Sequence, residues 1–176
     1  MAFVVNMTII VQLSSDIDLH TLHDKSDDIV YSPRSFSGAK YRCFNPCYSA
    51  LIFRTGKVTL TGVTSISKAR QAADHLANYL TSLGLNITVV SLNVKNQVIS
   101  FNAERTIDLP KFYNLHKAES SYEIELFPGL IYRNSIYGIT MLIFSSGKII
   151  VTGIKATHQM DDITALLNSI KHSSSF

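Results

Sequence analysis

Hydrophobic and polar residues alternate along much of the chain, and two of the alternating stretches read almost alike. One runs from Leu51 to Gly62 and the other from Leu142 to Gly153, at a constant offset of 91 residues. In each stretch, two runs rich in Ile, Leu, Val, Thr and Phe flank a short segment that ends in Gly-Lys, which predicts a strand, a tight turn and a second strand. Because the unit occurs twice, the repeat predicts one pseudo-two-fold domain rather than a solenoid.

The rest of the pattern completes the same plan in each half of a single domain of 176 residues, with the first repeat at 1–86 and the second at 87–176. In the first half it predicts strands at Phe3–Leu13 and Gly38–Phe44, a short helix from Ser15 or Asp16 to about Lys25, and a long helix from Ser65 to Gly84. In the second half it predicts strands at Ile87–Ala103, Gly129–Arg133, Ile139–Phe144 and Gly147–Thr152, and helices at Asp108–Leu115 and Thr157–Lys171. These elements predict an α+β fold, in which an antiparallel sheet carries helices on one face.

The other face of the predicted sheet is left without a covering layer. Alternation directs Ile52, Val58, Leu60, Ile143, Ile149 and Val151 toward the helices, and Leu51, Phe53, Thr59, Thr61, Thr140, Leu142, Phe144, Ile150 and Thr152 toward the opposite face. Because large exposed apolar patches mark interaction surfaces, this face is predicted to bind a partner. A further layer of the fold, or a second copy of the chain, would also explain it.

Composition adds little to the functional interpretation. The chain is 46% hydrophobic, enough for a sizeable core, and its net charge of +3 does not by itself indicate a nucleic-acid partner. Cys43 and Cys47 are expected to be reduced structural thiols, since no cluster of histidines accompanies them. No apolar run is long enough to span a bilayer, so no membrane partner is expected.

Residue patterns of catalysis are missing from the sequence. We find no Ser-His-Asp ordering, no Gly-rich phosphate loop and no metal-ligand spacing, and therefore expect no catalytic residue, no metal and no cofactor. Glu123 and Glu125 could be read as a carboxylate pair, but their alternation along a strand-like stretch favours a solvated rim.

The string SSYEIELFPGLIYR at residues 120–133 resembles the TATA-box-binding protein family. The resemblance covers essentially the whole chain, although the first repeat and both long helices are more divergent. It implies a pseudo-two-fold saddle of two repeats, a curved antiparallel β-sheet with helices on the convex face and the DNA minor groove on the other.

Four phenylalanines match the residues that this family inserts into DNA. They form two pairs, Phe36 with Phe53 and Phe127 with Phe144. An apolar ring inserted at a base step unstacks it and kinks the duplex, and TATA-binding proteins are a standard example of such wedging. The resemblance therefore implies that each pair acts at one end of the DNA site.

Other family positions imply contacts to the groove and the phosphates. Asn6 with Asn96, and Thr61 with Thr152, would donate to adenine N3 and thymine O2 at the centre of the site. Further groove contacts are implied at Thr8, Leu51, Thr59, Val98, Thr140, Leu142 and Ile150, and phosphate contacts at Arg42, Thr55, Lys57, Arg133, Ser146, Lys148 and Lys155. Thr8, Thr59 and Thr140 stand where the family usually has valine and Gln97 where it has an aliphatic residue, so we expect all four to add polar groups to this face.

The resemblance also implies protein partners. Glu123, Glu125 and Leu126 match the loop that docks transcription factor IIB, and a factor IIA-like protein and TBP-associated factors are further partners of the family. The expected function is a minor-groove binder that bends TATA-like promoter DNA and nucleates preinitiation-complex assembly, in the nucleus or, if the source is archaeal, in the cytoplasm. The alternatives are a transcription scaffold with weak or no specific DNA binding and, less favoured, a fragment of an enzyme with a similar saddle unit.

Overall fold

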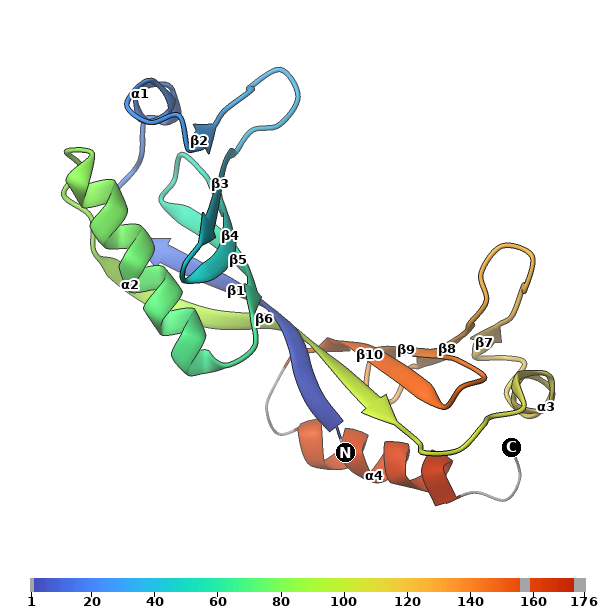
Figure 1. The fold of residues 1–176 in the computed structure, drawn as a ribbon. Coiled ribbons are helices and arrows are strands. Elements are labelled where there is room, and N and C mark those ends of the chain that lie inside the picture. Colours follow the sequence, from blue (N-terminus) through green and yellow to red (C-terminus); the bar gives the residue numbers. More distant parts are fainter. Residues whose placement is uncertain (1, 156–158, 173–176) are drawn as a thin grey trace. The chain divides into compact units, whose positions relative to one another are not determined.

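The computed structural model describes residues 2–155 and 159–172. These residues form two compact units, each of which holds most of one predicted repeat. The first-repeat unit comprises Asn6–Lys95, and the second-repeat unit comprises the described residues within Met1–Val5 and Asn96–Phe176. Strands β1 (Ala2–Leu13) and β6 (Val89–Asn102) each supply residues to both units (Figure 1).

The two units are built from the same elements in the same spatial order. In the first, the neighbouring strands run β2-β3-β4-β5-β1, with β2 at Ile29–Val30, β3 at Ala39–Phe44, β4 at Cys47–Ile52 and β5 at Lys57–Val63. In the second they run β7-β8-β9-β10-β6, with β7 at Ser120–Ser121, β8 at Leu130–Asn134, β9 at Ile139–Ile143 and β10 at Lys148–Ile154. The pairings within both units are antiparallel, so the predicted α+β class with an antiparallel sheet is confirmed.

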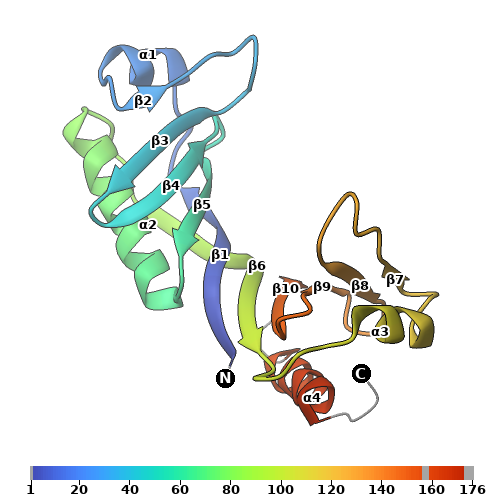
Figure 2. The same cartoon turned by 45° about the vertical axis from the view of Figure 1, so that its right-hand side comes forward.

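Each unit carries one long helix and one short one. The long helices are α2 (Ile66–Ser82) and α4 (Gln159–His172), and the short ones are α1 (Leu19–Asp24) and α3 (Leu109–Leu115). Each long helix lies along one face of the strands of its own unit (Figures 1 and 2). In the part of the chain that the structure describes, no helix is both long enough and apolar enough to cross a bilayer.

The long helices are predicted from two apolar stripes, which are Ala69, Ala73, Leu76, Leu80 and Leu83 in the first half and Met160, Ile163, Leu166, Leu167 and Ile170 in the second. Ser65 caps α2 by accepting a hydrogen bond from the Lys68 amide, and Ala69, Ala72, Ala73, Leu76, Ala77 and Leu80 are buried beneath it. In α4 the buried positions are Ile163, Leu167 and Ile170, while Met160 and Leu166 are half-buried. The predicted start of this helix at Thr157 lies outside the described residues.

The predicted start of the first short helix is wrong. Asp18, rather than Ser15 or Asp16, is its N-cap, because its carboxylate accepts from the amides of His20 and Thr21. The preceding chain is held by a hydrogen bond from the Ile17 amide to the Arg54 carbonyl oxygen at 2.7 Å. The Thr21 hydroxyl also donates to the Asp18 carboxylate, at 2.8 Å, and this bond is the largest cause of the lowered pKa of Asp18. Asp108 caps α3 in the same way, so the cap repeats along with the strands.

Alternation along the strands separates a covered face from an open one, as predicted. Ile52, Val58 and Leu60 in the first unit, and Ile143, Ile149 and Val151 in the second, are fully buried on the helix side. Beneath α2, Tyr41 stacks on Tyr79 with ring centroids 4.8 Å apart, and the Tyr48 hydroxyl bonds to His75 Nδ1 at 2.9 Å. Burial raises the pKa of both Tyr41 and Tyr48. Both tyrosines are buried and belong to the covered core rather than to the open face.

Candidate nucleic-acid interface

Every residue expected to contact the minor groove is half-buried on the side of the strands away from the long helix. The first-repeat unit brings together Asn6, Thr8, Leu51, Thr59 and Thr61, and the second brings together Asn96, Val98, Thr140, Leu142, Ile150 and Thr152. Strand pairing places Leu51 opposite Thr59 in the first unit and Ile150 opposite Leu142 in the second. Each unit thus presents a surface of aliphatic side chains interleaved with hydroxyls and amides.

The four phenylalanines form two pairs of nearly identical geometry. The ring centroids of Phe36 and Phe53 are 5.8 Å apart with an interplanar angle of 64°, and those of Phe127 and Phe144 are 5.8 Å apart at 65°. All four rings are half-buried rather than fully exposed, because each lies against the other ring of its pair. Edge-to-face packing of this kind holds the rings in a defined position.

Each phenylalanine pair packs so closely against a glycine that no larger residue fits at that position. A Cβ added at Gly38 would lie 2.8 Å from Cε1 of Phe36 and 3.0 Å from Cε1 of Phe53. At Gly129 the corresponding distances are 2.7 Å to Phe127 and 3.0 Å to Phe144. Any larger residue would displace both rings, so the glycine helps to set where each pair stands.

Two asparagines are held in one orientation by the backbone. Asn6 Oδ1 accepts from the Gly62 amide at 2.9 Å, and Asn96 Oδ1 accepts from the Gly153 amide at 2.9 Å. Because a backbone N–H can only donate, the amide oxygen must face the glycine and the Nδ2 group is left to donate elsewhere.

The backbone around these asparagines is adapted to the contact. The register of strand pairing shifts between Met7 and Ile9 in the first unit and between Val151 and Ile154 in the second. The glycines at these irregularities have φ of 90° at Gly62 and 94° at Gly153, a region that disfavours residues with a Cβ. In the second unit, Asn96 Nδ2 also donates to Thr152 Oγ1 at 3.2 Å, which leaves the Thr152 hydroxyl hydrogen to donate to a ligand.

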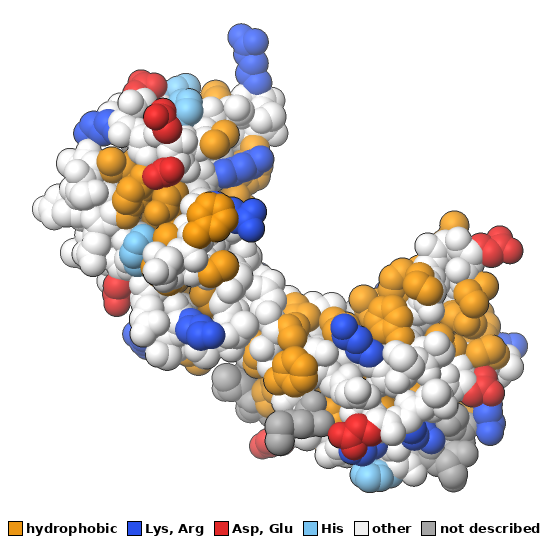
Figure 3. All heavy atoms as spheres, in the orientation of Figure 1, with side chains coloured by type: hydrophobic (Ala, Val, Ile, Leu, Met, Phe, Trp, Pro, Cys, Tyr) orange, Lys and Arg blue, Asp and Glu red, His pale blue; other side chains and the backbone are white. Residues whose placement is uncertain are grey.

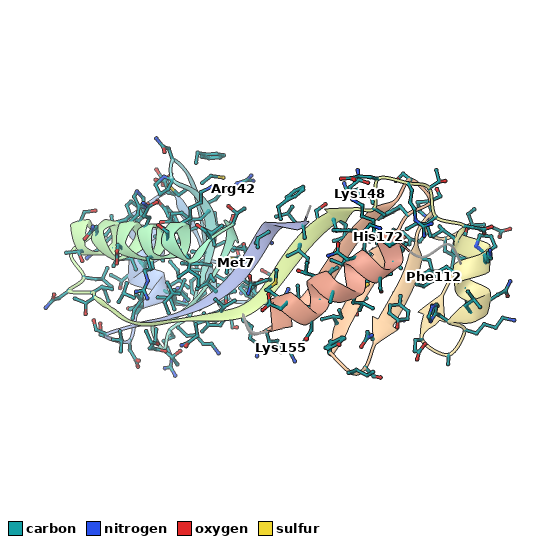
Figure 4. All side chains as sticks on the ribbon, turned by 90° about the horizontal axis from the view of Figure 1, so that it is seen from below. Met7, Arg42, Phe112, Lys148, Lys155 and His172 are labelled. Carbon is teal, nitrogen blue, oxygen red and sulfur yellow. The ribbon has the colours of Figure 1, made fainter. Side chains whose placement is uncertain are left out.

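The side chains expected to bind phosphate are all exposed, and six of the seven form three pairs at equivalent places in the two units. Arg42 and Arg133 lie on β3 and β8, and Thr55 and Ser146 lie in the turns that precede β5 and β10. Lys57 and Lys148 begin β5 and β10, and Lys155 follows the end of β10. Lys148 and Lys155 therefore stand at the two ends of one strand (Figure 4).

The open face of the first-repeat unit is hollowed beside its phenylalanine pair. A groove of about 570 Å³ is lined by Ile10, Tyr31, Ser37, Phe53, Arg54, Thr55, Lys57 and Thr59. It combines an apolar floor with two cations, which suits an anionic ligand that also offers flat apolar surface. No group of three or more His, Cys, Asp or Glu side chains that could hold a metal ion occurs within residues 2–155 and 159–172.

The expectation for Gln97 is wrong. Its side chain is 5% exposed, with Nε2 buried and without a hydrogen-bond partner, whereas its neighbours Asn96 and Val98 are half-buried on the open face. The reason is the two-residue period of a strand, which turns a side chain next to Asn96 to the opposite side. Gln97 therefore adds no polar group to the open face, and the three threonines remain.

The segment that holds Glu123, Glu125 and Leu126 is a turn and not the strand-like stretch inferred from its alternation. The amides of Leu126 and Phe127 both donate to the Glu123 carbonyl oxygen, at 3.0 and 2.9 Å. All three predicted docking residues are exposed, and Leu126 is 81% exposed. The first unit has the same turn, in which the amides of Ser35 and Phe36 donate to Ser32 O.

Sequence reasoning did not single out Gly38, Gly129, Gly62 or Gly153, whose backbones position the phenylalanines and the asparagines. Their recurrence at the repeat offset was a usable signal, since Gly38 and Gly129, like Gly62 and Gly153, are 91 residues apart. Lys40 and Arg54 were also missed; at the 91-residue offset they correspond to Ile131 and Ser145, so the repeat gave no signal for them.

Comparison with known proteins identifies the class to which this fold and face belong. A family model described as transcription factor TFIID (or TATA-binding protein, TBP) matches residues 1–83 and 91–170. The chain belongs to this TATA-binding protein family.

Particular members show how far the similarity extends. TATA-box-binding protein 2 of Entamoeba histolytica is 36% identical over 152 residues, which are 86% of this chain and 72% of that protein. TATA-box-binding protein of Aeropyrum pernix is 37% identical over 158 residues, 89% of this chain and 77% of that protein. The solved structure of Methanococcus jannaschii TBP matches with a TM-score of 0.84 and 30% identity, covering 98% of this chain and 99% of that one. The fold is thus that of a TATA-binding protein.

Proposed function

We propose that this protein binds TATA-like promoter DNA in the minor groove, bends it, and nucleates assembly of a transcription preinitiation complex. The observation that carries this proposal is that one arrangement of groups is built twice. Each unit holds a phenylalanine pair with centroids 5.8 Å apart and an asparagine whose Oδ1 lies 2.9 Å from a glycine amide. Two such units suit the two halves of one short duplex site.

The open-face polar groups account for a preference for A·T pairs. The minor-groove edge of an A·T pair offers acceptors only, while a G·C pair adds the guanine amino donor. Asn6 and Asn96 present Nδ2 donors because the glycine amides occupy their oxygens. Leu51, Leu142 and Ile150 lie on the same open faces and offer a guanine amino group no acceptor, so a G·C pair against them would leave that donor unsatisfied.

The phenylalanine pairs account for bending. Rings held over Gly38 and Gly129 can enter a base step without first being ordered, so less conformational entropy is lost on binding. Insertion unstacks the step and bends the duplex toward its major groove, and the bent DNA then meets more of the protein. Exposed cations on the strands and turns around each face would hold the backbone in this bent form.

Removing hydroxyls from the open face is expected to sharpen base discrimination. A threonine hydroxyl can accept from a guanine amino group, whereas valine cannot. Thr59→Val should therefore raise the penalty for a G·C substitution at the base pair it contacts by roughly 1 kcal/mol, and Thr8→Val and Thr140→Val should act likewise. Competition binding with singly substituted duplexes measures this effect. Thr106→Val, on an exposed loop residue, is the control; equal discrimination by Thr59→Val and the parent would refute the role of the hydroxyl.

The Glu123–Leu126 turn is proposed as the docking site for a factor IIB-like protein. It presents two carboxylates beside a leucine that is 81% exposed, a combination that suits a basic partner surface with an apolar pocket. Factor IIA-like and TBP-associated factors are proposed as further partners, and the nucleus, or the cytoplasm of an archaeon, as the place of action.

Reversing one charge in this turn is expected to separate partner binding from DNA binding. Glu123→Arg should weaken recruitment of a factor IIB-like protein by about tenfold or more, because a base would then face a basic partner. Binding of the TATA duplex should remain within about twofold of the parent. Supershift assays report both quantities, with Asp74→Arg on the exposed side of α2 as the matched charge reversal. Normal recruitment by Glu123→Arg and Glu125→Arg alike would place the docking site elsewhere.

A gel-shift assay tests the proposed function. The parent protein should shift a TATA duplex at concentrations at least about a hundredfold below those needed for a scrambled duplex of the same composition, within the usual range of specificity ratios. A scaffold without specific DNA binding would shift both duplexes equally. In that case the proposed function fails, whatever the protein partners do.

A further inference from the structure

The two open faces differ sharply in charge although their strands match. Five basic residues of the first-repeat unit, Arg34, Lys40, Arg42, Arg54 and Lys57, correspond at the 91-residue offset to Glu125, Ile131, Arg133, Ser145 and Lys148. The first set is entirely basic, and the second contains two bases and one acid. Figure 3 shows the contrast, with Lys and Arg side chains over β3 and the β2–β3 loop of one unit and mostly hydrophobic side chains over β8–β10 of the other.

Lys40 lies on the same face of β3 as Arg42 and beside a phenylalanine of the pair. It is exposed, pairs with Leu51 across the strands, and holds its Nζ 5.8 Å from the centre of the Phe36 ring. In a similar way, Cζ of Arg42 lies 5.3 Å from the centre of the Phe44 ring. Two cations on alternate residues of one strand therefore follow the same edge of the open face.

Arg54 stands at the boundary between two adjoining hollows. It lines the groove of about 570 Å³ with Tyr31, Ser37 and Lys57, and it also lines a hollow of about 300 Å³ with Asp16, Asp18 and His20. Its backbone is fixed because its carbonyl oxygen accepts from the Ile17 amide. The Asp18 carboxylate is already engaged with the His20 amide and the amide and hydroxyl of Thr21.

These cations are available for an external anion. Within residues 2–155 and 159–172, none of the five first-repeat bases forms an ion pair with an acid. Arginine forms paired hydrogen bonds to phosphate, and a hydroxyl such as that of Ser37 or Tyr31 can add another. DNA phosphates are the anions that a minor-groove ligand would bring to the edge of this face.

We propose that Arg54 and Lys40 are phosphate-binding residues of the first-repeat unit, and that DNA is held more strongly by phosphate contacts at this end of its site than at the other. The proposal rests on the proposed function, because it requires a duplex on the open faces. The second repeat, with Ser145 and Ile131 at the equivalent positions, has no counterpart to these two contacts. More of the salt dependence of DNA binding should therefore arise at the first-repeat end of the site than at the other.

The proposal is tested by exchanging residues at equivalent positions of the two repeats. Each base of the first repeat is replaced by the uncharged residue of the second, and the reverse. Each phosphate contact contributes about 0.9 to the slope of log affinity against log salt concentration. Arg54→Ser and Lys40→Ile should each make this slope shallower by about one, and their combination by about two. Ser145→Arg and Ile131→Lys should each make it steeper. Affinity for a TATA duplex is measured by fluorescence anisotropy from roughly 50 to 300 mM KCl.

Arg70→Ser is the matched control, since it removes one exposed cation from α2, on the covered side of the same unit. It should leave the slope close to that of the parent. Slopes unchanged in Arg54→Ser, Lys40→Ile and their combination would overturn the inference, as would an equal change in Arg70→Ser, which would indicate only an effect of net charge. The failure of the proposed function looks different: the parent itself would then show no preference for TATA over scrambled duplex.

Discussion

Phe144→Ala is expected to bind a TATA duplex roughly 30-fold more weakly than the parent and to bend it less. A ring inserted between bases is removed from water on binding, and burying a phenylalanine side chain contributes about 2 kcal/mol. Without the ring, the unstacked step loses the apolar contact that offsets its cost. Phe53→Ala should behave alike, because its pair has the same 5.8 Å separation. Gel shift reports the affinity, and energy transfer between dyes on the DNA ends reports the bend.

The stability of the same variant separates a wedge from a core residue. Phe144 is half-buried against Phe127, so truncation should lower the free energy of unfolding by about 1 kcal/mol, the value of an aromatic pair. Phe112, which lies on α3 and is 1% exposed with its ring against Tyr132 of β8, is the comparison, and Phe112→Ala should lose about 3–5 kcal/mol. If Phe144→Ala is destabilised as much as Phe112→Ala, Phe144 is a core residue and not a wedge.

Asn96→Asp is expected to weaken TATA binding by about 3 kcal/mol, roughly a hundredfold, with little change in stability. The aspartate keeps an oxygen for the Gly153 amide, so the local fold can persist. The Nδ2 donor is replaced by a carboxylate oxygen that would face the groove acceptors and the negative potential of the DNA. Anisotropy titrations give the affinity, and thermal melting checks the fold.

A second asparagine supplies the control for this charge change. Asn168 is exposed on α4, so Asn168→Asp adds the same charge on the covered side of the same unit. It should bind TATA within about threefold of the parent, because exposed charges at a distance are largely screened by salt. Equal losses in Asn96→Asp and Asn168→Asp would show that net charge, and not the oriented amide, determines the affinity.

The repeat and the alternation made most of the fold predictable. Ile52, Val58 and Leu60 are buried because a strand next to a helix must bury alternate side chains, and this period was visible in the sequence. The stripe of Ala69, Ala73, Leu76 and Leu80 located α2 for the same kind of reason. Such features depend on near neighbours along the chain, which a sequence displays directly.

The features that the sequence did not predict depend on contacts between distant residues or on the exact alternation of side chains along a strand. Gln97 was placed on the open face because it stands beside Asn96, although the strand period turns it inward. The orientation of the Asn6 amide arises from Gly62, 56 residues away, and nothing near Asn6 in the sequence specifies it. The spacing of the phenylalanine pairs likewise depends on how closely the rings approach Gly38 and Gly129 in the folded chain.

Bending of DNA by the unmodified protein is the most direct test of the proposed role. The parent protein should bring the dye-labelled ends of a TATA duplex closer together, seen as a rise in energy transfer that saturates at one protein per duplex. A scrambled duplex of equal length should show little change at the same concentrations. If the parent binds the TATA duplex without raising the energy transfer, or raises it equally for both duplexes, the proposal that the paired phenylalanines bend TATA-like DNA is wrong.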